Sequence, residues 1–397
     1  SAGAYRGYGA TQGIFAVEST VNKLADRLSM DPIVLRQKNM IHEGDVMPAY
    51  YGETANSCRL EECLLKASDM IGWKEKGMRT VMPDGKIRAR GVAMAMQGSS
   101  ISNCDVGSVT VKLSDEGTYH ITVGCTDMGT GCDTIIAQFA ADVLETPIDN
   151  ISVYGVDTDI SPYDSGSYAS STTYLTGMAA VKACEQLRER IIALAAVRMN
   201  KDASALTFDG ENVIDESDGA KMSLFDIATA SMCNNEISLE VTYSHSSPVS
   251  PPPFMAACAE IEADPETGAI ELLDYTACVD CGTVVNTNLA RVQTEGGLLQ
   301  GIGMTLYEDI WYDERGKNLS NSFMQYKVPS RLDTDRIRVE FDSSYEPTGP
   351  FGAKSIGEIV INTPAPAIAD AVYNATGVWI NELPITPEKI LKGMKVI

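Results

Sequence analysis

The chain has 397 residues, of which 44% are hydrophobic and 21% charged, proportions typical of globular proteins and not of disordered ones. This length predicts one large domain or two to three ordinary ones. Its 54 acidic and 31 basic residues give a formal net charge of -23 without any run of lysine or arginine, which excludes nucleic acid and anionic membrane as expected partners.

The composition also bears on membranes, redox state and metals. Apolar stretches such as Ile191–Val197 are far shorter than the ~20 residues of a membrane-spanning helix. The ten cysteines are scattered through apparent strands and helices, and we expect reduced core thiols in a cytoplasmic protein. Cys278 and Cys281 have the spacing of metal ligands, but there is no second pair and there are three histidines in all, so no zinc site is expected.

The first predicted elements are two helices within residues 11–40. From Ile14 onward, apolar residues recur at steps of three and four, the period of an amphipathic helix. The apolar face of this helix would comprise Ile14, Val17, Val21, Leu24 and Leu28. The second helix is predicted to open at Asp31 as N-cap, with Pro32 at the first helical position.

The glycine-rich segment Gly3–Gly13 therefore leads into a helix N-terminus. Unpaired N–H groups and the helix dipole favour an anion at such a position, and glycines let a ligand approach the backbone. The alternative is a plain turn made by Gly7 and Gly9, with a solvated Arg6.

Beyond a polar stretch that runs to about Lys86, strand and helix patterns are mixed. The expected strands are 91–97, 108–113, 118–124, 238–244, 256–264 and 269–280, with turns at 114–118 and 265–268. The expected helices are 134–144, 173–197 and 289–303. This mixture predicts an α+β fold in which mixed sheets are covered on one side by helices.

Two later loops share the design of the first one. Asp127–Thr134 and Asp164–Thr172 each lead into a predicted helix and offer small residues and backbone donors. The second loop adds hydroxyl groups from Ser165, Ser167, Ser170, Ser171 and Thr172. Together the three loops predict a large ligand with phosphate and other polar edges, whereas each loop alone is equally consistent with a helix cap.

A single carboxylate, Glu358, follows Gly357 and precedes an apolar Ile-Val-Ile run. A carboxylate in apolar surroundings loses solvation, which raises its pKa and makes it a competent general base near neutral pH. The sequence is equally compatible with an exposed turn residue at this position.

In this order, these elements resemble the molybdenum hydroxylases of the xanthine dehydrogenase and aldehyde oxidase family. The resemblance spans nearly the whole chain and covers about the C-terminal half of a family molybdopterin-binding subunit. The matching motifs are Ala4–Gly9, Met128–Gly131, Ala169 with Ser170, Gln293–Gly296 and Lys354–Glu358.

The resemblance implies a role for each matching residue. Glu358 would be the catalytic base, and the backbone of Arg6 and Ala169 would lie near molybdenum. Tyr8, Met94 and Ala95 would face the substrate, with Tyr8 as an aromatic wall. The residues implied to bind the pterin cofactor are Arg6, Gly129, Thr130, Gly131, Ser167, Ala169, Ser170, Ser171, Thr172 and Gln293.

Three departures from the family pattern matter. Thr130 stands where many members have glutamine, and Thr11 where proline is common. Met94 and Ala95 lie in the strand where purine-oxidising members often place a second aromatic residue and a threonine. The first two leave the cofactor interpretation intact, whereas the third puts the substrate in doubt.

The resemblance also implies the organisation of the protein. Residues 1–80 would be the end of a first cofactor-binding domain and residues 81–397 a second one, with a proline-rich linker at 244–254. Because Ser1 falls within a motif, we expect a missing upstream half of the subunit. Iron–sulfur and FAD groups are expected on partner subunits or domains.

The predicted function is molybdenum-dependent hydroxylation of an aromatic N-heterocycle of the xanthine type, with water as oxygen source. The cofactor would be molybdopterin, in its cytosine dinucleotide form, with molybdenum. The alternatives are a nicotinate- or aldehyde-oxidising relative, or a cofactor-free fragment with only an assembly role. The 397-residue piece alone is expected to be inactive.

Overall fold

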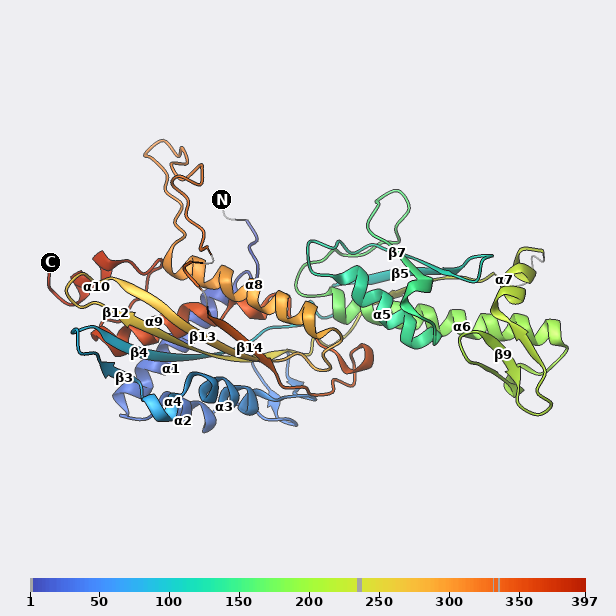
Figure 1. Ribbon diagram of the computed structural model, residues 1–397, viewed down its shortest axis with the longest axis horizontal. Helices are drawn as coiled ribbons and strands as arrows, with labels where there is room; N and C mark the ends of the chain where they lie inside the picture. The colour runs from blue at the N-terminus through green and yellow to red at the C-terminus, as the bar shows by residue number, and fades with distance from the viewer. Residues whose placement is uncertain (1–2, 234–237, 331, 335) are drawn as a thin grey trace. The chain divides into compact units, whose positions relative to one another are not determined.

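A computed structural model describes residues 3–233, 238–330, 332–334 and 336–397. It divides the chain into two compact units (Figure 1). Unit 1 comprises residues 1–97, 251–346 and 356–397, and unit 2 comprises residues 98–250 and 347–355. The domain boundary near residue 80 and the linker at 244–254 stay predictions, although the chain does pass from unit 2 to unit 1 between Ser250 and Pro251.

Unit 1 is built on a five-stranded sheet of order β14-β13-β12-β4-β3, in which only the β13–β14 pair is parallel. The strands of this sheet are β3 (Arg79–Val81), β4 (Ile87–Met96), β12 (Phe254–Ala263), β13 (Ile270–Asp280) and β14 (Ile337–Phe341). A separate hairpin pairs β1 (Val46–Met47) with β2 (Glu53–Thr54). The helices of unit 1 are α1 (Ala10–Arg27), α2 (Pro32–Gln37), α3 (Leu60–Ile71), α4 (Trp73–Lys76), α8 (Thr287–Leu306), the short η5 (Ile359–Ile361), α9 (Pro364–Thr376) and α10 (Pro387–Gly393).

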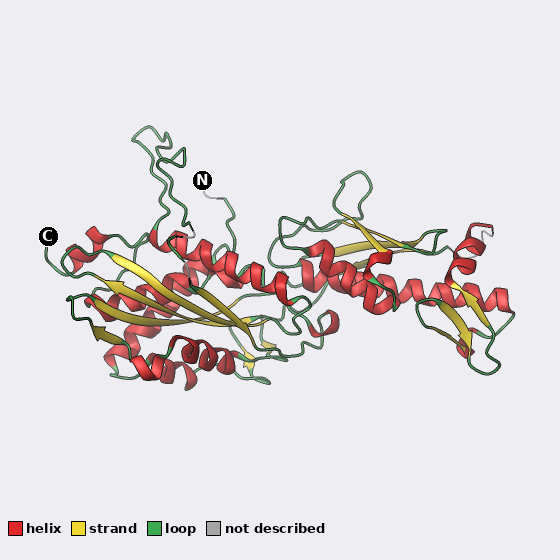
Figure 2. Cartoon of the chain, viewed as in Figure 1, coloured by secondary structure: helices red, strands yellow, loops and turns green. Residues whose placement is uncertain are grey.

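Helices cover both faces of this sheet (Figure 2). Alternate residues of β12 point to opposite faces, so Met255 and Ala257 pack under α8 and α9 while Ala256 and Cys258 pack against α3. α9 lies directly on β4, because a Cβ atom at Gly91 would come within 2.2 Å of the carbonyl oxygen of Ala367. The expectation of helices on one side only is wrong for this sheet, and a strand buried on both faces explains its nearly continuous apolar sequence.

Unit 2 holds a four-stranded sheet of order β11-β5-β6-β7 and a three-stranded sheet of order β10-β9-β8. Their strands are β5 (Gly107–Leu113), β6 (Tyr119–Val123), β7 (Ile151–Tyr154), β8 (Leu206–Phe208), β9 (Asn212–Asp215), β10 (Lys221–Ser223) and β11 (Glu240–His245). The helices are α5 (Cys132–Leu144), η1 (Ile148–Asn150), the π-helical turn η2 (Thr172–Thr176), α6 (Gly177–Met199), η3 (Ala203–Ala205), α7 (Leu224–Cys233) and η4 (Pro350–Gly352).

The first helix differs from its prediction in which face is buried. Val17 is 57% exposed, and Leu24 and Leu28 are also exposed. The buried face of α1 instead carries polar residues, among them Glu18 and Asn22. The amphipathic pattern therefore located the helix correctly, and Ile14 does pack against the core cluster under α8 and α9, but Val17, Leu24 and Leu28 of the predicted apolar face are exposed.

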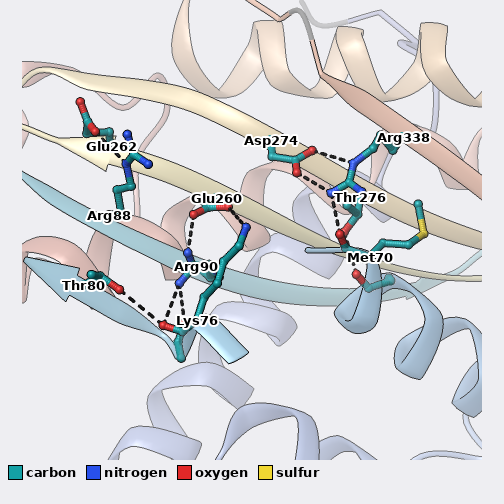
Figure 3. Close-up of polar contacts among 12 residues, drawn as sticks. Met70, Lys76, Thr80, Arg88, Arg90, Glu260, Glu262, Asp274, Thr276 and Arg338 are labelled. Carbon is teal, nitrogen blue, oxygen red and sulfur yellow. Dashed lines mark hydrogen bonds and ion pairs between the residues drawn. The ribbon is translucent and has the colours of Figure 1, made fainter. Parts of the chain in front are cut away.

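Charged pairs link neighbouring strands on one face of the five-stranded sheet (Figure 3). The register of β4 and β12 places Arg88 opposite Glu262 and Arg90 opposite Glu260, and both pairs form ion pairs. Lys76 also reaches Glu260, at 2.9 Å. Opposite charges directly across a strand pair stabilise the register, and here they fix β4 against β12.

Polar groups are also buried where α1, α2, β4 and α9 meet. The Arg36 guanidinium, 1% exposed, donates to Glu18 Oε2 through Nε at 3.1 Å and through Nη2 at 2.7 Å. Asp370 Oδ2 accepts the backbone N–H of Val92 at 3.1 Å. Burial raises the pKa of Asp370 to about 7, although the neighbouring Arg36 charge opposes this rise.

We expect Asp370→Asn to make the free energy of unfolding less dependent on pH. Because the pKa of Asp370 is raised on folding, the folded state binds the extra proton, and stability falls as pH rises from about 4 to about 7. The variant should equal the parent near pH 4 and exceed it near pH 8 by roughly 1–4 kcal/mol in the free energy of unfolding. Urea unfolding across that range measures the difference, and a constant difference between the two proteins would contradict it.

Among the described residues, no helix has both the length and the apolar character to cross a membrane. The nine cysteines with described side chains are free thiols, and all of them except Cys104 are buried, as the composition predicted.

Candidate active site

The loop before α1 is anchored in unit 1 by the side chain of Arg6. Its Nε donates to the carbonyl of Gly357 at 2.5 Å, its Nη1 to Gln300 Oε1 at 2.9 Å, and its Nη2 to the carbonyl of Gln293 at 3.4 Å. Burial lowers the pKa of Arg6, and the nearby Glu358 charge partly offsets this effect. Arg6 therefore ties the first motif to α8 and to the Lys354–Glu358 motif.

A glycine on α8 makes room for this arrangement. A Cβ atom at Gly297 would lie 2.3 Å from Val360 Cγ2 and 3.2 Å from Arg6 Cζ. Gly297, the residue directly after the motif Gln293–Gly296, is therefore also constrained, because any larger residue at this position would displace either Val360 or the Arg6 guanidinium.

Glu358 lies directly before η5 and is 9% exposed. Its Oε1 accepts the backbone N–H of Gly7 at 3.3 Å, and its Oε2 accepts Nε2 of Gln97 at 2.8 Å. The following residues Ile359, Val360 and Ile361 are buried, but the carboxylate itself meets polar donors. The expectation that the Glu358 carboxylate has apolar surroundings is thus wrong. The three residues that follow it in the chain are buried, as expected.

The three candidate substrate residues lie in different environments. Tyr8 is 43% exposed on the loop that carries Arg6. Met94 and Ala95 are consecutive in β4, and their side chains point to opposite faces of the sheet: Met94 packs with the cluster under α3 and Ala95 with the one under α8 and α9. The roles of all three stay predictions.

In unit 2, the Met128–Gly131 loop folds around the carboxylate of Asp127. Asp127 Oδ1 accepts the N–H groups of Gly129 at 2.9 Å and Gly131 at 3.1 Å. Burial acts against this anion, but the hydrogen bonds from Gly131 and Gly129 prevail and lower the pKa of Asp127. The loop therefore forms an anion-binding turn whose anion is its own aspartate, and those two N–H groups are already engaged.

The hydroxyl-rich loop 164–172 lies beside this turn. Ser167 Oγ accepts the N–H of Thr126 at 2.8 Å and donates to its carbonyl at 2.9 Å. Ser165 Oγ accepts the N–H of Val106 at 2.8 Å, and Ser171 Oγ donates to the carbonyl of Gly166 at 3.1 Å. The structure thus brings the second and third predicted loops together within unit 2.

Backbone strain is concentrated at two consecutive residues of this loop. Ala169 and Ser170 have φ values of 51° and 58°, the left-handed region that residues with a Cβ atom rarely adopt. The π-helical turn Thr172–Thr176 follows directly, ahead of α6. Strained backbone and π-helical turns are enriched at ligand-binding sites, which favours a binding role for Ala169 and its neighbours.

Gln97, Asn362 and Asp127 are site residues that the sequence interpretation missed. Gln97 directly follows β4, and Asn362 directly follows the buried Ile-Val-Ile run. Single amides carry no spacing signal, so the sequence could not single them out. Asp127 could have been recognised, since an aspartate two residues ahead of glycine is typical of a side chain that caps its own turn.

One further group of residues has metal-ligand chemistry. Ligand atoms of Asp127, Cys132 and Asp133 lie within 4.8 Å of one another. Since Asp127 Oδ1 is already held by the N–H groups of its own turn, this group is explained by the loop geometry.

The fold and these motifs define a molybdopterin-binding protein. The sequence matches the molybdopterin cofactor-binding domain family over residues 66–335, and a second family of the same description over residues 1–40. The chain belongs to this family of molybdopterin cofactor-binding domains. The resemblance inferred from the motifs and the α+β fold are thereby confirmed.

Particular relatives narrow the comparison. The chain is 37% identical over 407 residues to "Probable hypoxanthine oxidase XdhD" of Escherichia coli K12, covering 100% of this chain and 42% of that protein. It is 32% identical over 400 residues to "Xanthine dehydrogenase molybdenum-binding subunit" of Escherichia coli O157:H7, covering 98% of this chain and 53% of that protein. The chain therefore spans about half the length of the curated relatives it matches.

Solved structures agree on the fold. Quinoline 2-oxidoreductase from Pseudomonas putida 86 matches with a TM-score of 0.88 and 26% identity, covering 99% of this chain and 53% of that one.

Proposed function

We propose that this chain is part of the molybdopterin-binding subunit of a molybdenum hydroxylase and that it supplies the catalytic base, Glu358. The observation that carries the proposal is the position of the Glu358 carboxylate. It is largely buried, held at both oxygens by N–H donors, and adjacent to the loop of Arg6 and Tyr8. N–H donors stabilise the charged form of a carboxylate, which is the form that accepts a proton.

The donor set of the chain suits a molybdopterin cofactor. The strained residues Ala169 and Ser170 and the hydroxyl groups around them offer polar contacts without lysine or arginine, which fits the uncharged edges of a pterin. Gly129, Thr130, Gly131, Ser167, Ser171, Thr172 and Gln293 complete the proposed binding set. The carboxylate of Asp127 inside the glycine turn disfavours a phosphate at that point, so we assign this turn to the pterin ring system.

The bound cofactor would supply the metal centre at which a substrate carbon is oxidised and water provides the oxygen. The residues of the chain would do the rest. Arg6 and Ala169 would bring backbone groups to the metal centre, and Tyr8 would orient a flat substrate by stacking. Glu358 would accept the proton released as the oxygen attacks.

We assign the substrate to purine-type N-heterocycles because the two similar Escherichia coli relatives are named for hypoxanthine and xanthine. A nicotinate-type or aldehyde substrate is the alternative, since Met94 has no ring with which to stack. The cytosine dinucleotide form of the cofactor, iron–sulfur and FAD partners, and a cytoplasmic location belong to the same proposal.

The complete enzyme, purified from its native source, should contain molybdenum and pterin in amounts equal to this subunit. Elemental analysis and pterin fluorescence measure both. The 397-residue chain alone should fold and contain neither, because much of the binding surface is expected outside it. Native enzyme without molybdenum would refute the proposal and favour a purely assembly role. Specificity constants for xanthine, nicotinate and an aromatic aldehyde would then rank the substrate classes.

A further inference from the structure

A chain of hydrogen bonds from side chain to side chain ends on Glu358. Thr11 Oγ1 shares its one proton between Asn362 Oδ1 at 3.0 Å and the carbonyl oxygen of Gly7 at 3.2 Å, and Asn362 Nδ2 donates to Gln97 Oε1 at 2.7 Å. Gln97 Nε2 then donates to Glu358 Oε2 at 2.8 Å. We propose that Gln97 and Asn362 are positioning residues, forming with Thr11 a directional relay that aims Glu358. This inference rests on the proposed role of Glu358 as the base.

The direction of the relay follows from the chemistry of its members. A primary amide accepts only at oxygen and donates only at nitrogen, and an ionised carboxylate only accepts. The carboxylate therefore requires the N–H side of Gln97, which turns the oxygen of Gln97 toward Asn362. The oxygen of Asn362 in turn faces the hydroxyl of Thr11. Each amide is thus fixed in orientation by its neighbours.

Two members of the relay, Thr11 and Asn362, are buried, and Gln97 is partly buried. Asn362 is fully buried, so breaking either of its hydrogen bonds would leave a polar group without a partner in the interior. Gly7 lies against it with a φ of +70°, and a Cβ atom there would be 3.1 Å from both Asn362 Oδ1 and Thr11 Oγ1. The backbone N–H of the same Gly7 holds the second oxygen of Glu358.

Three separate parts of the sequence therefore meet in the relay that ends at the carboxylate. Thr11 comes from the first turn of α1, Gln97 from the residue after β4, and Asn362 from the residue after η5. The first of these adjoins the Arg6 loop. Removing the N–H of Gln97 should weaken the charged form of Glu358 and widen the range of carboxylate orientations.

The first test measures protonation of Glu358 directly, without turnover. In the 397-residue chain, infrared spectra that change with pH and disappear in Glu358→Gln report this one carboxyl group. Gln97→Met, similar in size but without a donor, should move the titration midpoint up by about 1 pH unit. Thr11→Val, at the far end of the relay from Glu358, should move the titration midpoint in the same direction by a smaller amount. An unchanged midpoint in Gln97→Met would overturn the proposal; if that variant does not fold, an unchanged midpoint in Thr11→Val would do so.

Gln37→Met is the matched control. Gln37 Nε2 donates to Glu61 Oε1 at 3.0 Å, which is the same amide-to-carboxylate bond elsewhere in unit 1. This variant should leave the Glu358 midpoint unchanged, and an equal shift would show a general effect on the fold and overturn the assignment.

The second test uses the complete enzyme. Gln97→Met should move the acid limb of kcat/KM upward by about 1 pH unit and leave cofactor content unchanged. If Glu358→Gln is inactive but the acid limb of Gln97→Met does not move, the positioning role fails and the proposed base remains. If Glu358→Gln keeps its turnover, the proposed base fails, while the infrared midpoint still decides the relay.

Discussion

Replacing Glu358 with glutamine is expected to lower turnover of the complete enzyme by about 10²–10⁴-fold, the loss typical of a missing general base. Glutamine keeps the size of the side chain and, through its single amide oxygen, one of the two accepted N–H contacts, but it cannot accept the proton. Molybdenum and pterin content should be unchanged, because Glu358 is not among the proposed cofactor-binding residues. Steady-state kinetics and metal analysis on the same preparation measure both quantities.

Glu346→Gln is a suitable comparison for this variant. Glu346 is a buried carboxylate in the same unit, and its Oε2 accepts the hydroxyl of Ser57 at 2.7 Å. Its replacement removes an equal charge from another site and should leave turnover intact. Wild-type turnover in Glu358→Gln, or loss of its molybdenum, would assign Glu358 a structural role.

Replacing Arg36 with methionine is expected to destabilise the chain by about 3–5 kcal/mol. Arg36 and Glu18 are both largely buried, and the guanidinium also donates to Asn22 Oδ1 at 2.8 Å and to the carbonyl of Pro32 at 3.0 Å. Without Arg36, the Glu18 carboxylate would remain buried beside Asp370 with no opposite charge. Denaturant unfolding of the 397-residue chain measures the loss.

An exposed ion pair provides a control for the loss of stability expected in Arg36→Met. Lys392 and Glu388 are one turn apart on α10, and their side chains are 63% and 67% exposed. Lys392→Met should change the free energy of unfolding far less than Arg36→Met does, because solvent screens the exposed pair. Equal effects for Arg36→Met and Lys392→Met would show that the buried pair is not what holds α1, α2 and β4 together.

Local signals in the sequence were reliable where chemistry acts over a few residues. Asp31 accepts the N–H of Ile33 with Pro32 at the start of α2, as predicted. The expected turn at 114–118 joins β5 to β6, with Ser114 N–H bonded to the carbonyl of Thr118. Caps and hairpin turns depend on neighbours in sequence, so they can be recognised without the fold.

Burial depends on residues that are distant in the sequence, and local sequence patterns do not predict it for α1. The period of Ile14, Val17 and Leu24 identified a helix, but α1 presents its polar face to β4 and α2 because Arg36 lies there. A buried arginine needs acceptors, and Glu18 and Asn22 supply them. No hydrophobic pattern can reveal that a helix is packed through charge.

The candidate site divides in the same way. The motif residues Arg6, Gln293 and Glu358 could be named from the sequence, and unit 1 does bring them together through the contacts of Arg6. The amides that orient Glu358 could not be named, since Gln97 and Asn362 act through a single contact each with the next member of the relay. Their positions depend on how β4 and the segment after η5 meet in three dimensions.

The discontinuous path of the chain sets an order of assembly on the ribosome. Strand β4 ends at Met96, but β12, one of its two neighbours in the sheet, begins only at Phe254, and α9, which covers β4, begins at Pro364. The four strands of the β11-β5-β6-β7 sheet are synthesised between β4 and β12, so they can pair before β12 is available to pair with β4. The hydrogen bond from the Gly7 N–H to Glu358 joins residues that are 351 positions apart in the sequence. A nascent chain therefore lacks the site of the proposed base until Glu358 has been synthesised.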